Sequence, residues 1–401
     1  MLCALALLSA IAPLATDMYL PGLPVMAESL GSSTVGVQLT LTTFMAGLGL
    51  GQLLVGPLSD GWGRRRLILA GTAVLAVSSA VCALAPTVGV LIAARLVQGF
   101  SGGIGIVLAR AVIADRAKGT TAAKLFSIMM IIGGVAPVVA PLLGGVLLGP
   151  IGWRGIFWVL TGLSVVMAVG TFLFVPETLP PEKRHGGGLK AMSSNFGYVL
   201  RQRRFVGYAA AMALGFGAMF SYISASPFVT QNVLGLSPGQ FSMVFAVNSV
   251  GLVLANTLNT RLVDRFAVRS LLTFGMTTMF VAAALLLLTM LFVGYKTFLI
   301  LPLLFVTVSM VGLSLGNATA LAQEQVPKAA GTGSAVIGAL QFGLAAAVSP
   351  LVGLGGESTG IPMGLSIAVC TGLALVLLLT LAREPAQRGS ELRPAEPEPA
   401  D

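Results

Sequence analysis

The sequence predicts an all-α polytopic membrane protein with twelve transmembrane helices, arranged as two pseudo-symmetric halves of six. Three observations predict this fold class. Of the 401 residues, 56% are hydrophobic and 9% are charged, which is more apolar surface than a water-soluble globule can bury. Apolar stretches of roughly 20 residues, the length needed to cross a bilayer, recur along the chain. Features of the first half of the sequence also return in the second half.

The apolar stretches are separated by short polar turns. They do not alternate apolar and polar residues, as the strands of a membrane β-barrel would, so we expect helices. The first stretch lacks the basic segment of a signal peptide and is interpreted as a transmembrane helix. The expected spans lie at about residues 2–25, 35–57, 67–85, 88–112, 122–147, 155–175, 204–226, 239–260, 270–293, 297–321, 332–354 and 362–382.

The basic residues favour one side of the membrane. If successive connections alternate sides, 20 of the 23 Lys and Arg residues fall on one side, which the positive-inside rule assigns to the cytoplasm. Both termini then lie in the cytoplasm. The net charge of +9 is explained by a surface that faces anionic lipid, without nucleic acid as a partner. We therefore expect a multi-pass membrane protein with its basic surface in the cytoplasm.

Two sequence features recur about half a chain apart. Asp60, after the second span, corresponds to Asp264 after the eighth, and Pro141 of the fifth span corresponds to Pro350 of the eleventh. Internal repetition of this kind is frequent in transporters. The predicted organisation is a six-helix bundle at 1–176, a cytoplasmic linker at 177–203, a second six-helix bundle at 204–382 and a disordered cytoplasmic tail at 383–401.

Two ionisable residues remain inside the spans once the connections are set aside, Asp17 in the first and Arg95 in the fourth. A charge at the bilayer centre costs at least about 2.5 to 3.5 kcal/mol, so such residues normally face a wet cavity or each other. Asp17 could bind a proton, and Arg95 could tune that site or orient a substrate, with Gln98 one turn away on the same face. Alternatively, the two charges form a static ion pair, or Asp17 is solvated near the outer surface.

Enzymatic and ATP-driven functions are not expected. The chain contains no Gly-Lys pair and therefore no G-x-x-x-x-G-K-[ST] phosphate loop. Its three cysteines lie within spans without the spacing of metal ligands, and the single histidine, His185, lies in the predicted linker. No nucleophile or acid–base pair accompanies the two buried charges. We expect a protein that is not an enzyme and needs neither a metal nor a cofactor.

Several segments resemble motifs of the major facilitator superfamily and, within it, of the drug:proton antiporters of the Bcr/CflA type. In the first half they are "TDMYLPGLP", "GQLLVGPLSDGWGRRR", "RLVQGFSGG", "APVVAPLLGG" and "GWRGIFW", and "FSYISASPFV" follows in the seventh span. The resemblance implies the major facilitator fold, a functional monomer and a multi-pass location in the bacterial cytoplasmic (plasma) membrane. It also implies export of a small amphipathic drug by alternating access, driven by the proton gradient. "QLTLTTF" resembles chloramphenicol exporters as well as bicyclomycin exporters, so phenicols are favoured. Proton-coupled export or import of a natural metabolite on the same fold is the alternative.

The resemblance also implies gating residues. Asp60, Arg64 and Asp115 match residues that form a cytoplasmic gate against the start of the eleventh helix, although arginines after a span also anchor topology. Pro137 and Pro141, one turn apart, remove backbone hydrogen bonds and bend the fifth helix. The resemblance implies a hinge there near the outer gate, and a kinked packing helix is the alternative.

Substrate contacts are inferred from polar and aromatic side chains within the spans. An apolar cavity with aromatic rings and a few amides suits a mostly neutral, amphipathic small molecule. Any one of these side chains could instead pack between helices or face lipid. The candidates are Tyr19, Gln98, Phe220, Tyr222, Asn248, Asn317, Gln341 and Phe342.

Overall fold

The structure is a computed structural model that describes the chain except for residues 1, 118, 181, 183–195 and 383–401. A few side chains within helices, including that of Asp60, are also outside the described part. The predicted tail at 383–401 and most of the predicted linker at 177–203 therefore fall outside the described residues. The remainder of the linker contributes a short helix at 196–201.

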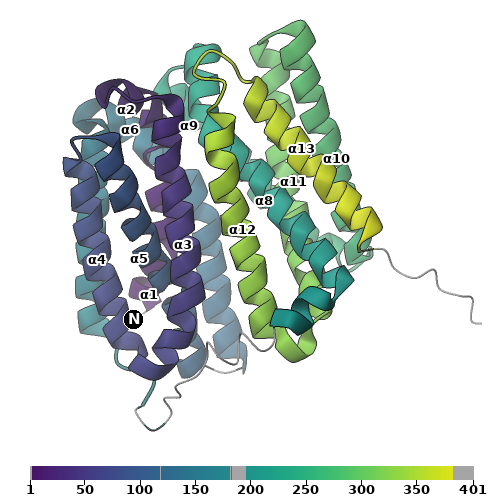
Figure 1. The fold of residues 1–401 in the computed structure, drawn as a ribbon. Helices are drawn as coiled ribbons and strands as arrows, with labels where there is room; N and C mark the ends of the chain where they lie inside the picture. Colours follow the sequence, from purple (N-terminus) through teal and green to yellow (C-terminus); the bar gives the residue numbers. More distant parts are fainter. Residues whose placement is uncertain (1, 118, 181, 183–195, 383–401) are drawn as a thin grey trace, which may run out of the picture.

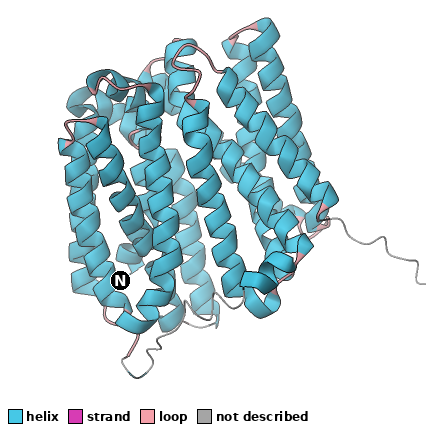
Figure 2. Cartoon of the chain, in the orientation of Figure 1, coloured by secondary structure: helices cyan, strands magenta, loops and turns pink. Residues whose placement is uncertain are grey.

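Every regular element in the described part of the chain is helical (Figure 2). The N-terminal half consists of α1 (Leu2–Asp17), η1 (Leu20–Gly22), α2 (Leu23–Ser29), α3 (Thr34–Trp62), α4 (Arg64–Leu84), α5 (Val88–Arg116) and α6 (Gly119–Phe174). The C-terminal half consists of α8 (Arg203–Phe228), η3 (Val229–Val233), α9 (Pro238–Leu262), α10 (Val268–Leu288), η4 (Thr289–Val293), α11 (Thr297–Glu324), η5 (Pro327–Ala329), α12 (Ala330–Val352) and α13 (Ile361–Thr380).

The all-helical membrane fold predicted from the sequence is confirmed. In the described residues, eleven helical segments are long and apolar enough to cross a bilayer. The difference from twelve arises at α6, which contains both the fifth and the sixth predicted span. Gly152 interrupts it with a φ of 65°, a conformation that glycine adopts without steric penalty. The helix is therefore kinked at this residue, within the predicted connection between the two spans.

The first predicted span, in contrast, is interrupted near its end. α1 stops at Asp17, and η1 and α2 follow as separate short elements. Pro21 and Pro24 lack the backbone N–H groups that a continuous helix would need here. Asp17 thus lies at a helix C-terminus inside the predicted span, where the sequence predicted an unbroken helix.

The distribution of side chains is that of a membrane protein. Large apolar residues are exposed on the outward faces of the helices; Val146 is 73% exposed and Phe292 is 79% exposed. Polar residues are instead buried between helices, including Arg95, Gln98 and Asn248. Because only a lipid environment favours this arrangement, it matches the multi-pass topology.

The two halves meet along two pairs of helices, α3 with α12 and α6 with α9. α3 and α12 lie side by side in Figure 1. We use "outer end" for the end of the bundle that carries α2, which the charge distribution predicts to be extracytoplasmic. Cross-half hydrogen bonds at this end include one from Gln231 of η3 to the carbonyl oxygen of Pro21, at 3.1 Å.

Candidate functional site

Asp17 is a buried carboxylate at the contact between the halves. Its side chain is 5% exposed, and it has no hydrogen bond or ion pair with any residue that the structure describes. Tyr222 of α8, in the opposite half, is close enough for an electrostatic interaction with it. The C-terminus of α1 presents the negative end of the helix dipole, which disfavours an ionised carboxylate. This position is suited to a group that binds and releases a proton.

Tyr222 belongs to a buried polar and aromatic cluster of α8 and α9. Asn248 Nδ2 donates a hydrogen bond to the Tyr222 hydroxyl oxygen at 2.8 Å. The Tyr222 ring stacks on Phe245, with ring centroids 5.5 Å apart. Because the hydroxyl oxygen accepts from Asn248, its own hydrogen can be donated to a facing acceptor. Two of the predicted substrate contacts, Tyr222 and Asn248, are thus placed together, within electrostatic range of Asp17.

Arg95 is fully buried within the N-terminal half. Its Nη1 donates to the Ala15 carbonyl oxygen at 2.9 Å and to Gln98 Oε1 at 2.6 Å, and its Nε donates to the Thr40 carbonyl oxygen at 3.4 Å. Gln98 in turn donates to Ser79 Oγ at 2.7 Å. The guanidinium therefore connects the backbones of α1 and α3 to the polar face of α5.

Three aromatic rings surround the Arg95 guanidinium. Its central carbon lies 4.1 Å from the ring centroid of Phe44, 4.5 Å from that of Tyr19 and 5.8 Å from that of Phe157. Such contacts stabilise a desolvated cation by about 2 kcal/mol or more. Nη2 has no hydrogen-bond partner among the described residues. Tyr19 thus contacts Arg95, and its hydroxyl lies 3.0 Å from Thr40 Oγ1.

The possible ion pair between Asp17 and Arg95 does not form in this structure. Arg95 contacts the backbone of α1 at Ala15, two residues before Asp17, but its hydrogen bonds go to carbonyl and amide oxygens. The positive charge is compensated by dipoles and rings, and no carboxylate in the described part of the chain pairs with it. The two charges are therefore separate sites joined through the backbone of α1.

The aromatic candidates lie on α8 and α12. Phe216 stacks on Phe220 with ring centroids 6.3 Å apart, and it meets Phe342 edge-on at 6.0 Å. Phe342 also approaches Gly49 of α3 across the halves. Gln341 precedes Phe342 and is half-buried, without a hydrogen bond to a described residue. Phe216, Phe220 and Phe342 form an aromatic row, and its Phe342 end lies at the contact between the halves.

Asn317 lies apart from the other candidates. Its amide and that of Asn259 donate to each other, at 2.8 and 3.0 Å, and Asn317 also donates to the Leu313 carbonyl oxygen at 2.8 Å. These bonds join α11 to α9 within the C-terminal half. The structure therefore gives Asn317 a packing role between helices, which was the alternative for each of these candidates.

At the end of the bundle opposite α2, the structure brings together two of the three gating candidates. Arg64 Nε lies 3.3 Å from Asp115 Oδ2, and Arg64 also bonds to the Ser59 hydroxyl. Asp115 accepts a further hydrogen bond, from the Thr178 hydroxyl at 2.8 Å. Asp60 lies on the last turn of α3, and its side chain is outside the described part.

Glu177, which the sequence analysis did not single out, connects the start of the linker to this cluster. Its carboxylate accepts hydrogen bonds from the backbone N–H groups of Arg64 and Arg65, at 2.9 and 3.3 Å, and thus caps the N-terminus of α4. The N–H groups of Thr178 and Leu179 donate to it as well. Partial burial raises the pKa of Glu177, but these four donors outweigh it and hold the pKa below the ordinary glutamate value.

The Arg64 and Asp115 pair gives a first prediction. Arg64→Ala and Asp115→Ala should each slow transport, and the double variant should be little slower than either, because both changes remove the same contact. Initial transport rates in vesicles with matched amounts of protein test this. Additive losses would show that the two side chains act independently, and wild-type rates would remove them from the gate.

Glu177 gives a second prediction. Since its folded-state pKa is lowered, its stabilisation is fully present above the unfolded-state pKa and is lost as pH falls through the folded-state value. Glu177→Gln should lower the free energy of unfolding by about 0.5 to 2 kcal/mol at pH 7, as for loss of a helix cap. Thermal unfolding in detergent at pH 7 and below pH 4 measures this difference, which should shrink in acid. Glu182→Gln, an exposed neighbour, is the control, and an equal effect there would contradict the capping role.

The predicted hinge lies where α6 meets α1 and α9. Pro137 and Pro141 are within α6, and the Pro137 carbonyl oxygen accepts a hydrogen bond from Ser249 of α9 at 3.4 Å. One turn later, Gly144 packs directly on the Met18 backbone. The bend-forming segment thus touches the residue after Asp17 and also crosses to the other half.

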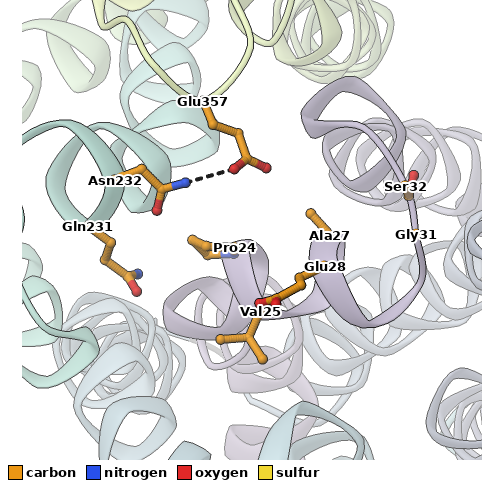
Figure 3. A pocket seen from close by; sticks show the side chains of 9 residues that line it. All are labelled: Pro24, Val25, Ala27, Glu28, Gly31, Ser32, Gln231, Asn232 and Glu357. Carbon is orange, nitrogen blue, oxygen red and sulfur yellow. Dashed lines mark hydrogen bonds between the residues drawn. The ribbon is translucent and has the colours of Figure 1, made fainter.

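A separate cavity of about 530 Å³ opens at the outer end (Figure 3). Glu357 and Asn232 line it from the C-terminal half, and Glu28 and Ser32 line it from the N-terminal half. Asn232 donates to Glu357 at 3.0 Å, and the hydroxyl of Thr34 contacts the same carboxylate across the halves at 3.5 Å. None of the predicted site residues lines this cavity. It lies at the outer end, and Asp17 is not among its lining residues.

Comparisons with known proteins agree with the fold. The family description "Major Facilitator Superfamily" matches residues 5–350. An uncharacterized MFS-type transporter, YdgK of Bacillus subtilis, is 37% identical over 382 residues, which cover 95% of this chain and 94% of the relative. The bicyclomycin resistance protein homolog of Haemophilus influenzae is 32% identical over 373 residues, with 93% of each chain covered.

Two further comparisons concern drug resistance and three-dimensional structure. A chloramphenicol resistance protein of Pseudomonas aeruginosa is 32% identical over 281 residues, which cover 70% of this chain and 66% of that protein. The crystal structure of the nucleoside transporter NupG superposes with a TM-score of 0.72 at 13% identity, covering 95% of this chain and 98% of the other. The structural likeness concerns the fold alone.

Proposed function

Because the chain belongs to the major facilitator superfamily, we propose that it is a proton-coupled antiporter that exports a small amphipathic drug by alternating access. The proton gradient drives export, and the chain works as a monomer in the bacterial plasma membrane. The relatives named for bicyclomycin and chloramphenicol resistance support a drug as the substrate. The "QLTLTTF" segment and the second of these relatives favour a phenicol.

The observation that carries the proposal is the position of Asp17. A buried carboxylate without a partner is expensive in a membrane unless it binds a proton or faces an aqueous cavity. Asp17 lies within electrostatic range of Tyr222 in the opposite half, and a change of access would expose it to one side and then to the other. A drug that competes with the proton for this region would couple the two movements.

The substrate is proposed to lie between Asp17 and the aromatic row. Tyr222 and Asn248 offer a hydroxyl and an amide, and Phe216, Phe220 and Phe342 offer apolar faces. This combination suits a mostly neutral molecule that has one aromatic ring and a few hydrogen-bonding groups. Phenicols fit this description.

A resistance panel and vesicle transport test the proposal. The chain is expressed in a bacterium that lacks its main efflux pumps, and minimum inhibitory concentrations are measured for a phenicol, bicyclomycin and a cationic dye. We expect at least a fourfold rise for the phenicol, because roughly a 50-fold gradient is available from one proton and 100 mV. Uptake of labelled phenicol into everted vesicles should require a proton gradient. Unchanged values for all three compounds would reject drug export, and uptake that runs in the opposite direction would favour the metabolite importer.

A further inference from the structure

Gln38 of α3 is a buried amide at the contact between the halves. Its side chain is 1% exposed, and Nε2 donates to the Ser224 carbonyl oxygen of α8 at 3.1 Å. The Ser349 hydroxyl of α12 donates to the carbonyl oxygen of Gln38, also at 3.1 Å. A single residue of the N-terminal half is thus bonded to two helices of the C-terminal half.

These three residues form a closed ring of hydrogen bonds, which we call the Gln38 ring. The Ser224 and Ser349 hydroxyl oxygens are 2.8 Å apart. Since Ser349 donates to Gln38, Ser224 is the donor between the two hydroxyls. Both serines are fully buried. Every bond of the ring that crosses between the halves has Gln38 at one end, so the ring cannot persist if the halves separate at this level.

The Gln38 ring also contains an unsatisfied group. Gln38 Oε1 has no hydrogen-bond partner among the described residues. Gly353, in the turn after α12, approaches so closely that a side-chain carbon there would overlap this oxygen. A buried acceptor without a partner destabilises the closed arrangement, and contact with water after opening would relieve it. The hydrogen bonds of the ring stabilise the contact between the halves, and the unsatisfied acceptor favours its opening. These opposing effects suit a contact that must form and break repeatedly.

Arg95 connects the Gln38 ring to the segment that carries Asp17. Its guanidinium donates to the carbonyl oxygen of Thr40, two residues after Gln38, and to that of Ala15, two residues before Asp17. The two backbone segments are therefore held together. A displacement of α1 when Asp17 changes its protonation state would be passed to α3 at the level of the ring.

We propose that the Gln38 ring is an outer lock, which keeps the halves together at the outer end and must break before this end opens. Gln38 is then a positioning residue that sets the balance between the two access states. The inference rests on the alternating access of the proposed function and adds the residues that oppose outer opening. The proposed lock consists of Gln38, Ser224 and Ser349, which lie near the outer termini of α3, α8 and α12.

The test measures the distance across the outer end by pulsed electron paramagnetic resonance. Spin labels are placed at Glu28→Cys of α2 and Gly239→Cys of α9, both exposed, in a chain whose Cys3, Cys82 and Cys370 are replaced by alanine. Ser349→Ala should raise the ratio of long to short distances about fivefold, as for loss of one net hydrogen bond. Gln38→Ala removes the unsatisfied Oε1 together with the Nε2 donor, so it should raise the ratio by less than Ser349→Ala. The double variant should raise the ratio further than either single change, because the Ser349 bond goes to the backbone carbonyl oxygen of Gln38 and survives Gln38→Ala.

Ser221→Ala is the matched control. Ser221 lies one turn before Ser224, is also buried, and bonds to the Ser366 hydroxyl at 2.7 Å within the C-terminal half. Its removal should leave the distances unchanged. Gly353→Ala retains every bonding group but intrudes on Gln38 Oε1, so it should open the outer end and serves as the test if another variant misfolds.

The lock is rejected if Gln38→Ala, Ser349→Ala and Gly353→Ala, eluting as monodisperse protein, retain the wild-type distances. It is also rejected if Ser221→Ala shifts them equally. The distances are read without a drug or a proton gradient, so the lock and the proposed function can fail separately. A distance shift in a chain that exports no compound would retain the lock and remove drug export.

Discussion

Replacing Asp17 with asparagine is expected to abolish uphill export while the chain still folds and inserts in the membrane. Asparagine has nearly the size of a protonated aspartate but cannot release a proton. The side chain is buried and has no described partner, so the exchange breaks no hydrogen bond or ion pair. The variant should therefore keep its drug affinity and its thermal stability to within about 1 kcal/mol.

The size of the expected loss follows from the energy that a proton supplies. One charge crossing a potential of 100 mV supplies about 2.3 kcal/mol, which sustains roughly a 50-fold gradient of a neutral substrate. Without a proton site on the carrier, this driving force no longer reaches the drug. Accumulation in energised everted vesicles should fall to the level obtained with an uncoupler, and drug-induced proton release should disappear.

Glu28→Gln is the matched control for Asp17→Asn. Glu28 is a carboxylate of the same half, but it is exposed at the outer cavity and lies outside the proposed proton site. It should export at the wild-type level. If Asp17→Asn still accumulates drug and still responds to an uncoupler as the wild type does, Asp17 is a structural group and the proton uses another site.

The fold could be predicted from the sequence because its determinants are local. Each span is specified by its own apolar length and each connection by its charges, so composition was sufficient for the helical membrane architecture. The two departures arise at glycine and proline. Gly152 interrupts α6 by its backbone conformation, and Pro21 and Pro24 interrupt the first span just after Asp17. Both are backbone effects that hydrophobicity does not report.

The candidate site was less predictable because it depends on which helices become neighbours. Asp17 and Arg95 stand out as charges in apolar spans, yet only the fold shows that they do not form an ion pair. The sequence does not distinguish Asn317 from Asn248, whereas the structure shows that the Asn317 amide is hydrogen-bonded to the amide of Asn259. Gln38 lies in the "QLTLTTF" segment, and its partners are a serine hydroxyl and a carbonyl group from distant helices. Its polar side chain within a predicted span was a signal that Gln38 could matter, but the sequence did not show which residues it contacts.

Arg95→Lys is expected to reduce export at least tenfold while the chain remains folded. Lysine retains the charge, but one ammonium group cannot donate to the Ala15 and Thr40 carbonyl oxygens as the planar guanidinium does while stacking between Tyr19 and Phe44. Loss of one hydrogen bond from a charged group is worth about 1.5 to 3 kcal/mol. If Arg95 joins the Asp17 segment to α3, this loss appears in transport. Arg154→Lys is the control, because Arg154 also stacks on a ring, that of Trp153, and donates to a carbonyl oxygen away from the site.

Arg95→Met separates coupling from a purely structural clamp. No described carboxylate pairs with Arg95, so the buried cation is retained at a desolvation cost that an apolar side chain of similar length would avoid. If the residue serves coupling, the folded fraction of the methionine variant should fail to export drug, whatever the lost hydrogen bonds to Ala15, Thr40 and Gln98 cost in unfolding temperature. If Arg95 is only a clamp between α1, α3 and α5, the same change should lower the unfolding temperature, and the folded fraction should export normally. Thermal unfolding in detergent and export per folded molecule distinguish the two outcomes. Coupling requires the guanidinium, whereas a bundle that folds without it can still be assayed for export.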